Sequence, residues 1–247
     1  MANIQFGTGT AAFVPSNINS PLLTSLTPLV PTLLQEMSVD FKASAKELYG
    51  RQQFAADVAR GKISASGKGK ITATDPLFLN SLYFGLPTSA GAVRPVTESH
   101  APAASVSTTH AANFAVDYGV VNGNTGVPMT LVASAPAVGQ YSVVVSTGIY
   151  TFNASETATS VLITYAWTDT TSGTTLAITN QQQGYSPQFS CNLFNTYQSK
   201  LFSLSLTTCK LTDIQIPTKM EDYWISDFSY VICANAAGLV GTIYADQ

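Results

Sequence analysis

Two long runs of alternating apolar and polar residues, separated by a short loop, occupy residues 36–73. The first run has apolar residues at every second position, namely Met37, Val39, Phe41, Ala43 and Ala45. The second run repeats this pattern after a loop around Gly50, with Ile63, Ala65, Gly67, Gly69, Ile71 and Ala73 on one side. A period of two is typical of half-buried strands. The pattern therefore predicts a long β-hairpin over 36–73.

The second strand of this hairpin begins near Phe54 and is longer than the roughly 3–10 residues usual for strands. We expect Gly61, Gly67 and Gly69 to bend or bulge it. A hairpin of this length overhangs a small domain and leaves an unpaired edge, which invites aggregation. Copies of the hairpin that lie side by side in a closed ring would remove that edge.

A single short helix is predicted over about 75–84. Asp75 can cap the free N–H groups, Pro76 suits the first turn and Gly85 suits the end. The face expected to pack on the apolar side of the hairpin consists of Phe78, Leu79, Leu82 and Tyr83.

The remaining regions differ in composition. Residues 1–34 combine Pro and Gly with many apolar residues, so we expect an extended arm on its own domain or a neighbour, without a long strand. Residues 86–112 are rich in Pro, Ala, Ser, Thr and Gly and predict a loop or linker. Short strands are expected at 114–121, 129–133, 141–145, 149–153, 160–168 and 174–179, and at 189–193, 201–206, 210–216, 224–233 and 239–244.

These elements predict a mainly β protein. After the arm over 1–34, a β-sandwich is expected from 35–92 and 185–247. A β-rich insertion over 93–184 forms either an outward lobe or part of one continuous sandwich. Turns at Asn122-Gly123, Thr147-Gly148 and Ser172-Gly173 suit hairpins. The segments 139–146 and 148–155 predict the two strands of one such hairpin.

Charged residues make up only 10% of the 247 residues, against about 25% in ordinary globular proteins. Because Lys and Glu keep free surfaces soluble, their scarcity indicates assembly. The net charge of −3 argues against a general nucleic-acid-binding protein. Seven of the eleven basic residues lie within 35–85, so a basic hairpin region could pair with acidic regions of other copies.

The sequence lacks the motifs of common active sites. The glycine-rich segments 7–12 and 61–69 resemble nucleotide-binding loops, but the first has no strand before it and the second has the wrong spacing. His100 and His110 lie in low-complexity sequence without an acid or Cys at ligand spacing. We therefore expect no enzyme activity, no cofactor and no metal site.

The cysteines, two aromatic residues and the distribution of apolar residues complete the sequence-based expectations. Cys191 shares a strand face with Phe189 and Leu193 and is expected to be a small buried residue, without a disulfide framework. Tyr165 and Trp167 could bind a sugar, but interior aromatics of a small sandwich are favoured. No signal peptide and no apolar run of about 20 residues is visible, so no membrane anchor is expected.

The segment LQEMSVDFKASAKELYGRQQFAADVARGKISASGKGKIT, followed by a helix ending in LYFG, resembles the major tail tube proteins of long-tailed bacteriophages. The shared features are a strand, a KELYG-type loop, a QF start to the next strand, an ARGKI core and a short helix before FG. The later run YSVVVSTGIYTF, VLITYAW and GTTLAITNQQQG resembles part of some of the same proteins. AADVA in place of a proline-containing strand start, and an arm poor in charge, depart from the pattern.

The resemblance implies a tail-tube-type β-sandwich that assembles as stacked, hexameric rings around a channel for genome delivery. It implies other copies of the chain and other tail proteins at the tube ends as partners. Genomic DNA would be in contact only in transit, without sequence-specific binding. The chain would be located in the virion tail after assembly in the host cytoplasm.

Site residues follow from the resemblance together with the strand pattern. Candidates for the channel surface are Asp40, Lys42, Ser44, Lys62, Ser64 and Ser66. Candidates for contacts between rings are Lys46, Glu47, Leu48, Tyr49, Lys68, Lys70, Asp213, Glu221 and Asp222. Because duplex DNA carries a charge about every 1.7 Å, a strongly basic lining would retain it. Either acids offset the lysines within the channel, as Asp40 would offset Lys42, or Lys62, Lys68 and Lys70 lie between subunits against acids of the 213–227 region.

Two other function classes remain open from the sequence. Another virion component, such as a capsid decoration or tail terminator, would form a fixed oligomer instead of open-ended tubes. A carbohydrate- or surface-binding β-module would use the 113–184 region and would be monomeric.

Overall fold

The computed structural model describes residues 4–18, 20–72, 76–218 and 220–246. The protein is mainly β, with several sheets and one short helical segment. The chain divides into two compact units, which we call unit 1 (Met1–Pro87 with Leu176–Gln247) and unit 2 (Thr88–Thr175). The sequence pattern places an insertion over 93–184, and unit 2 is the part of the structure that interrupts unit 1 there.

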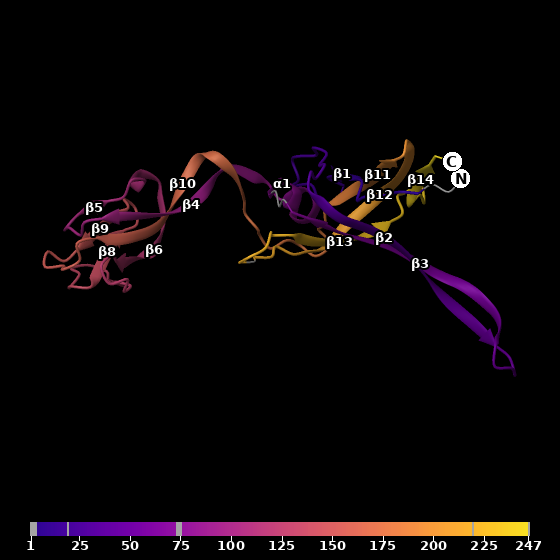
Figure 1. Ribbon diagram of the computed structural model, residues 1–247, viewed down its shortest axis with the longest axis horizontal. Helices are drawn as coiled ribbons and strands as arrows, with labels where there is room; N and C mark the ends of the chain where they lie inside the picture. Colours follow the sequence, from indigo (N-terminus) through magenta and orange to yellow (C-terminus); the bar gives the residue numbers. More distant parts are fainter. Residues whose placement is uncertain (1–3, 19, 73–75, 219, 247) are drawn as a thin grey trace. The chain divides into compact units, whose positions relative to one another are not determined.

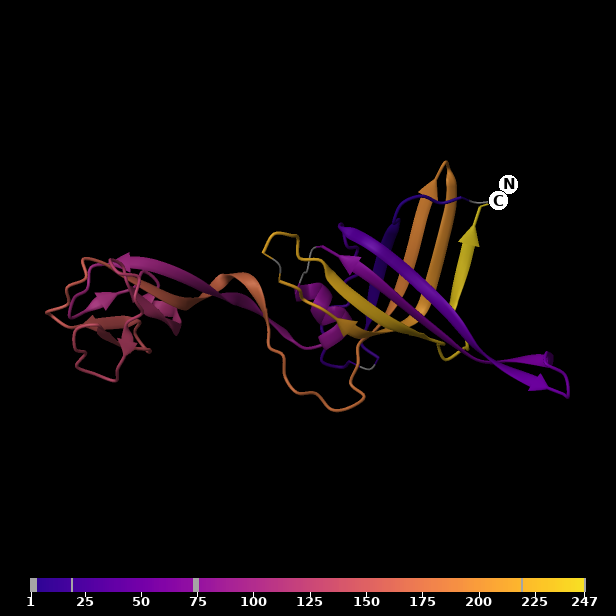
Figure 2. The same cartoon turned by 60° about the horizontal axis from the view of Figure 1, so that its bottom comes forward.

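Unit 1 contains a seven-stranded antiparallel sheet, which Figure 2 shows most clearly. Its strand order is β1 (Thr10–Ser16), β11 (Gln188–Tyr197), β12 (Lys200–Ile214), β13 (Ser226–Cys233), β3 (Ala55–Ile71) and β2 (Leu34–Tyr49). The short strand β14 (Gly241–Ala245) pairs with the start of β12, where β13 does not reach. The predicted hairpin is therefore confirmed, as β2 and β3.

One face of this sheet holds the core of unit 1. The buried positions alternate along β3 at Ala65, Gly67, Gly69 and Ile71, as the period of two predicts. Phe13 lies at the centre of this core, with its ring edge-on to Phe78, Phe189 and Phe228 at centroid distances of 5.6–6.0 Å. Aromatic pairs in such geometry add stabilisation beyond area burial.

The arm contributes more structure than its composition predicts. Strand β1 pairs with β11 over seven residues, with Phe13 opposite Cys191, so this part of the extended arm lies on its own domain as a regular edge strand, which the sequence pattern did not predict. Pro15 is tolerated because β1 is an edge strand, where a missing N–H need not break a ladder. The expected burial of Cys191 beside Phe189 is confirmed.

The helical segment consists of α1 (Pro76–Leu79) followed by one π-helical turn, Asn80–Phe84. It ends at Gly85, which has left-handed φ and ψ of 63° and 34°, as its position predicts. The buried residues are Phe78, Asn80, Ser81 and Leu82, whereas Tyr83 is 36% exposed. The packing face therefore differs from the predicted one, because the π turn changes the phase of the helix. Asp75 and Ala73 lie outside the described residues.

Two of the three glycines expected to bend β3 have another role. Gly67 and Gly69 pair regularly with β13, and a Cβ there would lie 2.1 Å from the Tyr230 ring and 2.5 Å from the Phe228 ring. The register of β2 with β3 instead shifts between the Ala43–Ile63 pair and the Ala45–Arg60 pair. The bulge therefore contains Gly61. Positions 67 and 69 therefore require a residue without a side chain, because aromatic rings of β13 lie against the backbone there.

We expect Gly67→Val to lower the free energy of unfolding by about 1–3 kcal/mol, since overpacking forces the Tyr230 ring or the strand to move. Denaturant unfolding followed by circular dichroism would measure the loss. Gly50→Val is the matched control, because nothing lies within 4 Å of a Cβ at Gly50. Equal stability of the two variants would contradict this account of Gly67.

Unit 2 is a small sandwich of two sheets around one core, visible in Figure 1. One sheet has the order β4 (Thr88–His100), β10 (Val161–Leu176) and β6 (Phe114–Asn122). The other has the order β5 (Val106–Ser107), β9 (Ile149–Phe152), β8 (Gln140–Val144) and β7 (Thr130–Leu131), with β7 parallel to β8. A 3₁₀ turn, Ala111–Asn113, precedes β6.

Several sequence expectations for unit 2 need correction. The predicted linker over 86–112 is wrong, because β4 spans thirteen of these residues. As an edge strand, β4 accommodates Pro95. The predicted hairpin turn at Ser172-Gly173 is also wrong, because β10 runs through it. Gly173 is needed there for its φ of 92° and its close approach to Ala92. The predicted β8–β9 hairpin is confirmed.

Strand boundaries in the C-terminal part also differ from the pattern. The two strands predicted at 201–206 and 210–216 form the single strand β12. The register of β11 with β12 shifts between the Phe189–Cys209 pair and the Cys191–Leu206 pair. This shift accommodates the change, near residue 207, in which alternate side chains of β12 are apolar. The interpretation of Tyr165 as an interior aromatic is confirmed, since its side chain is fully buried.

Candidate functional site

The outer part of the β2–β3 hairpin extends beyond the sheet of unit 1. Strand β13 pairs with β3 only over Ala65–Ile71, opposite Ser226–Ile232. Residues 41–64 are paired only within the hairpin itself, and Figure 2 shows them continuing past the end of β13. We call residues 41–64 the projecting hairpin. Nearly all its side chains are exposed, so the predicted overhang is confirmed.

The projecting hairpin exposes a large amount of apolar surface. Its exposed apolar side chains are Phe41, Leu48, Tyr49, Phe54, Val58 and Ile63. Phe41 and Ile63, with exposures of 52% and 60%, continue the face on which Met37 and Val39 pack against the core. The apolar face of the hairpin therefore continues beyond the point where its own unit can cover it. Contiguous exposed apolar surface of this kind marks an interaction site.

The tip of the projecting hairpin carries three of the residues predicted to contact another ring. Leu48 and Tyr49 are 65% and 58% exposed. The Tyr49 hydroxyl donates a hydrogen bond to the Glu47 carboxylate, which raises the pKa of Tyr49. Ser44, Lys46 and Lys62 line a shallow groove further along the hairpin. Their proposed contacts are therefore accessible to a second molecule.

The opposite face of the sheet is polar, and we call it the polar face. Residues directly opposite each other on neighbouring strands share a face, so the register of β2, β3, β13 and β12 groups the polar face into four rows. These rows consist of Glu36, Lys70 and Asp227; Ser38, Lys68, Ser229 and Asp213; Asp40, Ser66, Val231 and Lys210; and Lys42 and Ser64.

Opposite charges lie beside each other on this face. The Lys70 Nζ lies 3.1 Å from a Glu36 carboxylate oxygen. The hydrogen bond and charge of Glu36, with a smaller effect of Asp227, raise the pKa of Lys70. Both partners are about half exposed, so this pair contributes little to stability. Lys68 and Asp213 line the same groove as this pair.

The structure places the predicted site residues in three groups. Asp40, Lys42, Ser64 and Ser66 lie on the polar face with Lys68, Lys70 and Asp213. Ser44, Lys46, Glu47, Leu48, Tyr49 and Lys62 lie on the projecting hairpin outside the four rows, whereas Lys42 and Ser64 belong both to this hairpin and to the polar face. Glu221 and Asp222 are exposed in the loop between β12 and β13.

Three charged residues of the polar face are absent from the sequence-based set of site residues. Glu36, Lys210 and Asp227 join this face only through the pairing of β2 and β12 with β3 and β13. The alternation of β13 could have indicated that Asp227 and Ser229 share a face. Which residues lie beside them depends on the pairing register of β2, β3, β13 and β12, which cannot be predicted from the alternation of a single strand.

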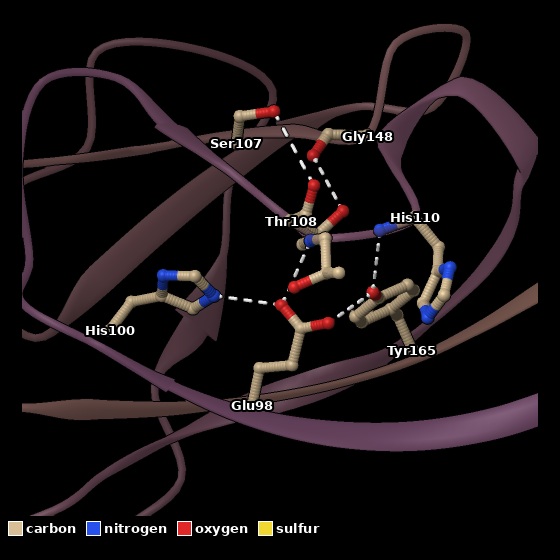
Figure 3. Close-up of polar contacts among 8 residues, drawn as sticks. Glu98, His100, Ser107, Thr108, His110, Gly148 and Tyr165 are labelled. Atoms are coloured by element: carbon tan, nitrogen blue, oxygen red, sulfur yellow. Dashed lines mark hydrogen bonds and ion pairs between the residues drawn. The ribbon is translucent and has the colours of Figure 1, made fainter.

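Unit 2 contains a separate polar network centred on Glu98, shown in Figure 3. The Tyr165 hydroxyl donates to Glu98 Oε1 at 2.6 Å, and His100 Nε2 lies 2.9 Å from Oε2. The backbone N–H of Thr109 also donates to Oε2, at 3.0 Å. The network ties the segment before the 3₁₀ turn to β4 and β10. His110, for which no site role is predicted, stacks on Trp167 with ring centroids 3.9 Å apart.

Burial disfavours the ionised form of Glu98, but hydrogen bonds from Tyr165, His100 and Thr109 outweigh it and lower its pKa from 4.5 to about 2. A lowered pKa in the folded state stabilises the fold above the unfolded pKa. We therefore expect unit 2 to lose this stabilisation as the pH falls from about 4.5 towards about 2.

Tryptophan fluorescence can measure this pH dependence. Of the two tryptophans, Trp224 lies in unit 1 and Trp167 in unit 2, so Trp224→Phe leaves a single reporter next to the network. In this background, denaturant unfolding at several pH values should show a smaller acid-induced loss for Glu98→Gln than for Glu98. Identical pH profiles would show that Glu98 does not contribute.

The described residues contain neither a metal-binding cluster nor a membrane-spanning helix. Among the described residues, no group of three or more His, Cys, Asp or Glu side chains is arranged to hold a metal ion. Within the same ranges, no helix combines the length and the apolar character needed to cross a membrane.

Comparison of the sequence with models of protein families gave no match, and comparison with curated proteins gave none. The observations that bear on function are therefore the projecting hairpin, the polar face and the resemblance described above.

Proposed function

We propose that this chain is the structural subunit of a bacteriophage tail tube, which assembles into stacked hexameric rings around a channel for genome delivery. In this proposal, unit 1 is the tube-forming part, and its seven-stranded sheet with the short helical segment has the tail-tube type of fold. Other copies of the chain are its main partners, and other tail proteins bind at the ends of the tube. The chain acts by assembly and catalyses no reaction.

The projecting hairpin is the observation that carries this proposal. Phe41 and Ile63 are more than half exposed on a face that is continuous with the core of unit 1. Burying a large apolar side chain stabilises a structure by about 1.5–3 kcal/mol. A neighbouring copy that covers these side chains would gain this free energy at every contact along a ring. The low content of charged residues, 10%, fits a surface largely covered by neighbours.

Sedimentation velocity of the purified full chain over a range of concentrations tests the proposal. An open-ended tube grows with concentration and gives a broad distribution of large species. A capsid decoration or terminator would instead give one closed oligomer, and a surface-binding module would remain monomeric. Either of these results would contradict a tube subunit.

A further inference from the structure

We infer that the acids of the polar face cancel its lysines so that duplex nucleic acid can lie against this face without being retained. The inference rests on the proposed function, because it concerns the surface that would face a DNA channel. It goes further in assigning this role to Asp213 and Asp227, two residues that come from strands outside the hairpin.

The charges balance within the four rows of the polar face. Its four rows hold the basic residues Lys42, Lys68, Lys70 and Lys210, and the acidic residues Glu36, Asp40, Asp213 and Asp227. From the first row to the last, the net charges are −1, 0, 0 and +1, which sum to zero. This balance contrasts with the excess of basic residues over acidic ones in 36–70 as a whole, seven against four.

The opposite charges are also close enough to screen one another. Neighbouring strands lie about 4.8 Å apart, so Lys68 is within two strand spacings of Asp213 across Ser229. This separation is comparable to the Debye length of about 8–10 Å at physiological salt. A phosphate backbone lying on the face would therefore meet paired charges and no continuous basic stripe. The Glu36–Lys70 contact of 3.1 Å is the tightest of these pairs.

Removing two acids should convert the polar face into a nucleic-acid-binding surface. Asp213→Asn with Asp227→Asn leaves four lysines against two acids, Glu36 and Asp40. Both aspartates are exposed, so the substitution should leave the fold intact. Each phosphate neutralised contributes about −0.9 to the slope of log affinity against log salt. Two additional contacts should therefore weaken binding about tenfold over a fourfold rise in salt.

The matched control removes the same charge elsewhere. Asp57 and Asp246 are exposed, lie outside the four rows of the polar face and each accept a backbone hydrogen bond that Asn can keep. The control variant is therefore Asp57→Asn with Asp246→Asn. A second test variant, Glu36→Gln with Asp40→Asn, removes two acids of the polar face on β2. It serves if the first variant does not fold, as judged by circular dichroism.

The experiment measures fluorescence anisotropy of a labelled duplex of about 30 base pairs with the full chain, over a series of salt concentrations. We expect weak binding by the unsubstituted chain and by the control. The folded test variant should bind about tenfold more tightly than the control at low salt, with a steeper salt dependence. Test and control variants of equal affinity would overturn the inference. If the chain formed no tubes, the proposed function would be contradicted, but the DNA affinities of the test and control variants could still be compared.

Discussion

Replacing Phe41 and Ile63 together with serine is expected to abolish assembly of the chain and to leave its fold intact. The two side chains are 52% and 60% exposed and lie on the projecting hairpin, so the folded subunit loses little packing. If a neighbouring copy buries them, each subunit contact loses about 1.5–3 kcal/mol per side chain. Because that loss recurs at every contact, the assembled form should disappear at concentrations at which the unsubstituted chain assembles.

The measurement combines sedimentation velocity with circular dichroism, so that assembly and folding are read separately. Leu131→Ser with Val145→Ser is the matched control, because these unit 2 side chains are 54% and 57% exposed. The control should assemble normally. Normal assembly of the Phe41 and Ile63 variant would show that the projecting hairpin is not the contact surface.

Phe13→Ala should cause the largest loss of stability of any substitution considered. The Phe13 side chain is fully buried and contacts three aromatic rings, those of Phe78, Phe189 and Phe228. Truncation of a buried Phe to Ala costs about 3–5 kcal/mol, from lost transfer free energy and the cavity that remains. The loss would also show that the arm is part of the core of unit 1.

Denaturant unfolding followed through Trp224, with Trp167→Phe as background, reports on unit 1. Phe6→Ala is the control within the same arm, since Phe6 is 77% exposed. It should cost about 1 kcal/mol or less. A Phe13 variant that is no less stable than the Phe6 variant would mean that β1 is not required for the fold.

The parts of the fold that follow from local alternation could be predicted, and the parts that depend on edge position could not. The β2–β3 hairpin was predictable because each strand shows a period of two over many residues. Strands β1 and β4 were missed because Pro15 and Pro95 suggest loops. Both prolines are acceptable only because these strands lie at sheet edges. The sequence does not state which strands are at the edges.

The candidate site shows the same limit. The lysines of β3 and Asp40 could be placed on one face from the alternation alone. Whether the charges of Asp213 and Lys210 lie on the same face, and so complete the charge balance, depends on the pairing of β3 with β13 and of β13 with β12. These residues are more than 130 positions apart in the sequence, and a shift of one residue in register would move every side chain to the other face.

Electron microscopy of the purified chain in negative stain would show directly whether the chain forms tubes. We expect hollow, open-ended tubes of constant diameter, built from stacked rings, and we expect them to be lost in the Phe41 and Ile63 variant. Closed oligomers of a single size, or monomers at all concentrations, would contradict it.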